Sequence, residues 1–152
     1  MIPDAHYCHT NLIARDWKRL ADFYQDVFGC RPVPPERDLS GAWLDGVTRL
    51  PGAHLRGMHL RLPGYGDDGP TLEIFQYEPE LPVESHPVNR PGYGHLAFAV
   101  ADVEAARQAV LAAGGGQVGD LVNVIVSGAG PICFVYMTDP EGNVIELQRW
   151  GD

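Results

Sequence analysis

The first third of the chain changes from an alternating to a helical pattern of apolar residues. Residues 6–14 alternate and predict a strand, and the apolar spacing after them becomes three and four. Asp16 stands where a helix N-cap is expected, and Gly29 stands where a left-handed residue would end the helix. We therefore predict a helix over 17–28. Its apolar face comprises Trp17, Leu20, Phe23, Tyr24, Val27 and Phe28.

The pattern is less regular after this helix. Residues 30–57 are rich in proline and glycine and contain a possible strand at 42–50. Residues 58–64 and 71–77 alternate and predict two strands, separated by the turn-forming cluster GYGDDG. Residues 79–93 hold four prolines and show no periodicity, which predicts a linker.

The strand-then-helix pattern returns after the linker. Residues 95–101 alternate, and Asp102 stands before a helical stretch that ends in a run of glycines. The face of this second helix comprises Val103, Ala106, Val110 and Ala113. Three more strands are predicted at 117–127, 131–138 and 143–150, the last two joined by the turn DPEGN. The order β-α-β-β-β thus occurs twice, which indicates an internal repeat.

The two copies of the repeat also match in position. Asp16 follows His9 by seven residues, and Asp102 follows His95 by seven. We predict an N-terminal module over 5–78 and a C-terminal module over 94–150. The last strand of each copy contains one glutamate between apolar residues. These glutamates are Glu73 and Glu146.

Strand alternation places His9, Glu73, His95 and Glu146 on the sheet faces that point away from the helices. A single strand histidine is more often structural than a ligand, and a single strand glutamate is more often solvated. The repetition of the pair favours a shared role, because a buried carboxylate needs a partner. Two imidazoles and two carboxylates suit a divalent ion: Ni, Co, Zn, Mn or Fe.

Composition narrows the classes of partner. The net charge of −9 argues against nucleic acid and anionic membranes, and it selects no particular substrate. Neither a signal peptide nor a transmembrane stretch is recognisable, so a soluble cytoplasmic protein is expected. Three scattered cysteines, Cys8, Cys30 and Cys133, predict no disulfide framework, and we expect each to be a small buried hydrophobe.

Three stretches resemble the vicinal oxygen chelate superfamily, which includes glyoxalase I, extradiol dioxygenases and drug-resistance proteins. They are HTNLIARDWKRLADFYQDVFG, GHLAFAVADVEAARQAVLAAGG and YMTDPEGNVIELQRW. The resemblance implies an α+β fold of two paired βαβββ modules, whose mixed sheet curls around a metal cavity. It implies metal ligands on the first and last strands of each module, which match the four residues above. It also implies a homodimer.

The His/Glu/His/Glu pattern is similar to bacterial glyoxalase I. That similarity implies a lyase or isomerase acting on a small substrate with vicinal oxygens through an enediolate-like intermediate. Glu146 is the first candidate for the proton-moving base, and Glu73 is the second. Ile13 and Tyr77 replace an arginine and an asparagine of glyoxalase I, which argues against a glutathione adduct.

Two alternatives stay open at this level. One is an Fe(II) dioxygenase that uses His9, His95 and Glu146, and the other is a non-catalytic drug-resistance-type protein that binds a small molecule. His59 alternates with Met58 and Leu60 and is a further candidate to face the cavity. Arg61 shares its face and is a candidate for an anionic substrate group.

Overall fold

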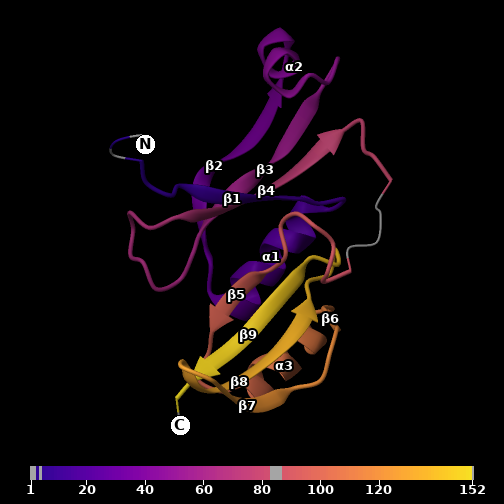
Figure 1. Cartoon of the computed structure of the whole chain (residues 1–152). Coiled ribbons are helices and arrows are strands. Elements are labelled where there is room, and N and C mark those ends of the chain that lie inside the picture. The colour runs from indigo at the N-terminus through magenta and orange to yellow at the C-terminus, as the bar shows by residue number, and fades with distance from the viewer. Residues whose placement is uncertain (1–2, 4, 83–86, 152) are drawn as a thin grey trace. The chain divides into compact units, whose positions relative to one another are not determined.

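A computed structural model describes residue 3 and residues 5–82 and 87–151 of the chain. It divides into two compact units, Met1–Pro82 and Val83–Asp152, each with its own mixed sheet (Figure 1). The predicted α+β class is confirmed. Part of the predicted linker, residues 83–86, lies outside the described residues.

The N-terminal unit builds a four-stranded sheet in the order β1-β4-β3-β2. Its elements are β1 (His9–Ile13), α1 (Trp17–Phe28), β2 (Arg31–Ser40), α2 (Ala42–Thr48), β3 (His54–Arg61) and β4 (Thr71–Glu78). The first strand, β1, runs parallel to β4, and the other pairs are antiparallel. Helix α1 packs on β3 and β4, where Leu60, Leu72 and Ile74 are fully buried. This burial leaves the alternate residues of β4, including Glu73, on the other face.

The expected strand at 42–50 is wrong, because residues 42–48 form α2. Backbone amides of Leu44 and Asp45 both donate to the carbonyl of Gly41, which closes the first helical turn. The Asp45 carboxylate accepts from the amides of Gly52 and Ala53, both at 2.9 Å. Leu44 is buried against Ala53 and Leu55, so a local core replaces strand pairing.

The proline-rich segment before α2 forms β2, a strand that the sequence did not indicate. This strand is at the edge of the sheet, where proline is tolerated because one side of the strand needs no ladder partner. Its register with β3 shifts between Val33 and Arg37. Pro34 and Pro35 lie within that irregularity, so their missing N–H groups interrupt no regular ladder.

The C-terminal unit repeats the arrangement with one extra short strand. Its elements are β5 (Leu96–Ala99), α3 (Val103–Ala112), β6 (Gly116–Gln117), β7 (Val122–Val126), β8 (Gly130–Thr138) and β9 (Val144–Trp150). The first strand again runs parallel to the last, in the order β5-β9-β8-β6, and β7 also pairs with β8. The single strand expected at 117–127 is divided into β6 and β7. The amides of Val118 and Gly119 both donate to the carbonyl of Tyr136, which breaks the ladder between them.

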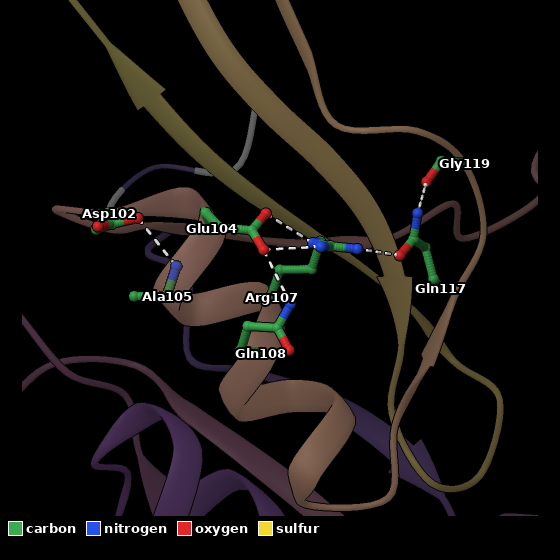
Figure 2. Close-up of polar contacts among 7 residues, drawn as sticks. All are labelled: Asp102, Glu104, Ala105, Arg107, Gln108, Gln117 and Gly119. Atoms are coloured by element: carbon green, nitrogen blue, oxygen red, sulfur yellow. Dashed lines mark hydrogen bonds and ion pairs between the residues drawn. The ribbon is translucent and has the colours of Figure 1, made fainter.

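Both long helices begin at the aspartates that the sequence indicated. Asp16 Oδ1 accepts from the Arg19 amide at 3.1 Å, and Asp102 Oδ1 accepts from the Ala105 amide at 2.9 Å (Figure 2). Gly29 ends α1 with φ of 69°, the left-handed conformation that glycine adopts without strain. No helix in the described ranges is long and apolar enough to cross a membrane.

The polar surface of α3 reaches β6 through one arginine. Figure 2 shows Arg107 between Glu104, one turn earlier on the helix, and Gln117 on β6. Hydrogen bonds from Arg107 and Gln108 lower the pKa of Glu104 to about 2. Glu104 is 54% exposed and Arg107 is half-buried, so the pair fixes the Arg107 side chain and adds little stability.

The three cysteines have different environments. Cys30 is buried beside the end of α1, as expected, and burial raises its pKa to about 11. Cys133 is half-buried. Cys8 is exposed, so its expected burial is wrong, because it lies just before β1 begins rather than within the packed strand.

Candidate metal centre

The N-terminal unit brings His9 and Glu73 together across its two parallel strands. The register of β1 and β4 places Asn11 beside Glu73, so His9 lies two positions earlier on the same face of β1. His9 Nε2 is 3.3 Å from Glu73 Oε2. The Asn11 amide donates to the same oxygen at 3.4 Å. The Glu73 side chain is only 12% exposed, so this carboxylate is largely desolvated.

The C-terminal unit brings His95 and Glu146 together in the same way. Ala97 lies beside Glu146 in the parallel register of β5 and β9, and His95 again lies two positions earlier. His95 Nε2 is 3.0 Å from Glu146 Oε2, and the Glu146 side chain is also 12% exposed. The repeat read from the sequence therefore has a three-dimensional counterpart in each unit.

The two pairs fit the chemistry of a divalent ion. Two ligands at about 2.1 Å from one ion, at angles between octahedral and tetrahedral, lie about 3.0–3.4 Å apart. The two N···O separations fall in that interval. Within the described ranges, no group of three or more His, Cys, Asp or Glu side chains is arranged to hold a metal. Each unit by itself therefore offers two donors.

His59 joins the N-terminal pair, although the sequence marked it only as a further candidate. The antiparallel register of β3 and β4 places His59 directly opposite Glu73. His59 Nε2 is 2.9 Å from Glu73 Oε1, and its Nδ1 is 3.4 Å from the Thr71 hydroxyl. Burial lowers the pKa of His59 and outweighs the opposing effect of the Glu73 charge. Strand alternation was the signal that found this residue.

Tyrosines lie close to both carboxylates. Tyr136 takes the position opposite Glu146 that His59 takes opposite Glu73, and its ring centroid is 5.2 Å from that of His95. Burial, with a contribution from the Glu146 charge, raises the pKa of Tyr136. Burial and the Glu73 charge also raise the pKa of Tyr77. Tyr77 packs against the small core beneath α2. Both phenols therefore keep their protons at neutral pH.

The structure also places Arg61 and Ile13, the two residues that the sequence connected with substrate binding. The Arg61 guanidinium donates to the carbonyl of Gly69, so it closes the connection between β3 and β4. Ile13 is 53% exposed at the end of β1. A neutral side chain thus occupies the place where the resemblance would put a carboxylate-binding arginine.

The chain belongs to the glyoxalase/bleomycin resistance protein/dioxygenase superfamily, whose family model matches residues 6–147. The resemblance drawn from the sequence is therefore confirmed. No curated protein sequence matches the chain at a significant level.

Solved structures show the same fold at low sequence identity. A glyoxalase family protein from Bacillus cereus is 17% identical with a TM-score of 0.80, and the match covers 100% of both chains. A glyoxalase I mutant from Zea mays is 20% identical with a TM-score of 0.63, over 93% of this chain and 44% of that one. A fosfomycin resistance protein from Listeria monocytogenes, solved with Mn(II) and sulfate, is 14% identical with a TM-score of 0.55. That match covers 99% of this chain and 95% of the Listeria chain.

Proposed function

We propose that the protein is a metal-dependent lyase or isomerase of the glyoxalase I type, acting on a small molecule with two adjacent oxygens. The observation that supports it is the repeated pair, His9 with Glu73 and His95 with Glu146, at ligand-like separations of 3.3 and 3.0 Å. In this proposal the two pairs bind one divalent ion, whether both come from one chain or from two. The bound ion would supply Lewis acidity toward the substrate oxygens.

We assign the proton transfer in this reaction to a carboxylate of the chain, that of Glu146. Glu146 takes a proton from the carbon next to the substrate carbonyl and returns it to the neighbouring carbon. The Glu146 side chain is only 12% exposed, so little water competes with a substrate for this carboxylate. The apolar residues on either side of Glu146, Ile145 and Leu147, are fully buried and fix its backbone.

The contacts of the two carboxylates favour Glu146 over Glu73 as the base. Three side chains lie within hydrogen-bond range of the Glu73 oxygens: His9, Asn11 and His59. Such contacts hold a carboxylate in one orientation. Glu146 lies against His95 and beside the ring of Tyr136. Glu73 therefore suits the role of a fixed ligand, and Glu146 suits that of a moving base.

The first test measures metal in untagged protein purified without chelators, by elemental mass spectrometry. The proposal expects about one divalent ion per chain, from the four-donor stoichiometry of such sites. The second test follows exchange of the α-proton for deuterium by NMR, with a panel of small α-hydroxycarbonyl and dicarbonyl compounds. Glu146→Gln should abolish exchange, with His54→Gln as a matched surface control. Full exchange in both Glu146→Gln and Glu73→Gln would contradict the assigned chemistry.

The remaining outcomes separate the alternatives. Stoichiometric iron together with oxygen-dependent turnover would indicate a dioxygenase instead. Stoichiometric binding of a small molecule without product, unchanged by alanine at the four residues, would indicate a binding protein.

A further inference from the structure

Three side chains in consecutive contact, Thr71, His59 and Glu73, lead from the interior of the N-terminal sheet to the Glu73 carboxylate. The Thr71 hydroxyl is 3.4 Å from His59 Nδ1, and His59 Nε2 is 2.9 Å from Glu73 Oε1. Thr71 is 9% exposed, and the side chains of His59 and Glu73 are 19% and 12% exposed. All three lie on neighbouring positions of β3 and β4, so the ladder itself sets their spacing.

The chemistry of the partners fixes which nitrogen of His59 carries the proton. A carboxylate only accepts hydrogen bonds, so Nε2 must donate to Glu73. In a neutral ring Nδ1 is then an acceptor, which matches the Thr71 hydroxyl as donor.

The two carboxylate oxygens of Glu73 have different partners. Oε1 is held by His59, whereas Oε2 faces His9 and Asn11. In the C-terminal unit the corresponding position belongs to Tyr136, whose ring lies against that of His95 at an interplanar angle of 53°. The two units are therefore alike in their His–Glu pairs and different in the residue opposite the glutamate.

We propose that His59 is a positioning residue that holds Glu73 Oε1, so that Glu73 presents Oε2 alone to the ion bound by His9. The inference rests on the proposed function and extends it. It makes the N-terminal carboxylate a rigid one-oxygen ligand, and it leaves proton transfer to the carboxylate opposite Tyr136. Partners that orient a ligand in this way are generally worth about 10–100-fold in metal affinity.

The experiment measures the affinity of the full chain for Zn²⁺ and Ni²⁺ by competition with a chromophoric chelator. His59→Phe keeps a flat ring beside Phe75, whose centroid is 5.7 Å away, and removes the donor. It should weaken binding by about 10–100-fold. His59→Gln restores an N–H donor and should recover part of the loss. His54→Phe, on the same strand but paired with Asp38 and Glu78, should leave the affinity unchanged.

Each other outcome counts against the proposal. Wild-type affinity in His59→Phe, alongside loss of binding in His9→Ala, would overturn the positioning role and leave the metal site standing. A His59→Gln protein no better than His59→Phe would overturn the hydrogen-bond explanation. A wild-type chain that takes up neither ion would overturn this inference together with the proposed function. Circular dichroism melting checks folding, and His59→Asn, whose amide is too short to reach Oε1, replaces the Phe variant if that one does not fold.

Discussion

The imidazole of His95 reaches the carboxylate of Glu146 across parallel strands, from two positions before the register partner of that glutamate. His9 stands in the same relation to Glu73. Because the geometry is repeated rather than merely the residue types, the two pairs should make comparable contributions to a metal site. This equivalence leads directly to a measurable comparison.

Replacing either histidine of the pairs should remove metal binding to a similar degree. His9→Ala and His95→Ala should each weaken Zn²⁺ affinity by more than about 100-fold, the upper end for loss of an outer-shell partner. The matched control is His54→Ala, because the ion pairs of His54 are with Asp38 and Glu78 and include neither candidate carboxylate. Isothermal titration compares the three variants. A loss confined to one of the two histidines would contradict the equivalence.

The aspartate caps should stabilise the two helices alike. Asp16→Ala and Asp102→Ala each leave an amide of the first turn without its side-chain acceptor. We expect each to lower the free energy of unfolding by about 0.5–2 kcal/mol in urea titrations. Serine at the same positions keeps an acceptor and should recover most of the loss. Equal destabilisation by alanine and serine would show that capping is not the cause.

Asp139 should be essential to the last turn of the chain. This carboxylate is 2% exposed, and its Oδ1 accepts from the amides of Glu141 and Asn143 at 2.9 and 3.0 Å. Asp139→Ala leaves both donors unmatched and should cost about 2–4 kcal/mol of unfolding free energy. Asp139→Asn, which keeps one acceptor oxygen, should cost less. Asp120→Ala at an exposed position is the control, and chemical denaturation measures all three.

Cys30 should resist alkylation where Cys8 reacts. Burial raises the Cys30 pKa from 9.0 to about 11, so at pH 8 its thiolate fraction falls by about 100-fold. Labelling with iodoacetamide at pH 8, followed by peptide mass spectrometry, should modify the exposed Cys8 first. Labelling of Cys30 should rise with pH as the solution approaches its pKa. Equal labelling rates of the two thiols in native protein would contradict this expectation.

The His54 contacts should stabilise the fold more at low pH than at high pH. The hydrogen bond with Asp38, at 2.6 Å, and the Glu78 charge raise the pKa of His54. The charged ring is therefore favoured by folding. Its contribution is complete below the unfolded pKa near 6.5 and fades as pH rises through the folded value.

The test compares the urea midpoints of wild type and His54→Gln at about pH 5.5 and about pH 8.5, below and above the unfolded pKa. The deficit of the variant should be larger at the lower pH. A deficit that is the same at both values would assign the effect to a neutral hydrogen bond instead.

Sequence patterns predicted the elements whose signals are local. Helix α1 followed from its cap, its apolar face and Gly29, and the alternation of Leu72 and Ile74 gave the face of β4. Helix α2 was missed because a seven-residue helix shows too little periodicity, and its stability comes from Leu44 packing on Leu55. Strand β2 was missed because its prolines are tolerated only at a sheet edge, which the sequence does not reveal.

The sequence predicted those residues of the candidate site that occur in both copies of the repeat. Repetition identified His9, Glu73, His95 and Glu146, and the structure brings each pair together within its unit. Opposition of His59 to Glu73 depends on the register of β3 with β4, which follows from the fold rather than from either strand alone. The metal, the base, the cytoplasmic location and the homodimer stay predictions.

Within each unit the strand made first lies beside the strand made last, β1 with β4 and β5 with β9. These pairings enclose almost the whole unit in one loop, so they carry the largest closure entropy of any contact in it. A nascent chain on the ribosome therefore exposes the histidine well before its glutamate has been synthesised. Neither donor pair exists in a truncated or half-folded unit. Capture of an ion by either pair would thus mark a unit that has finished folding.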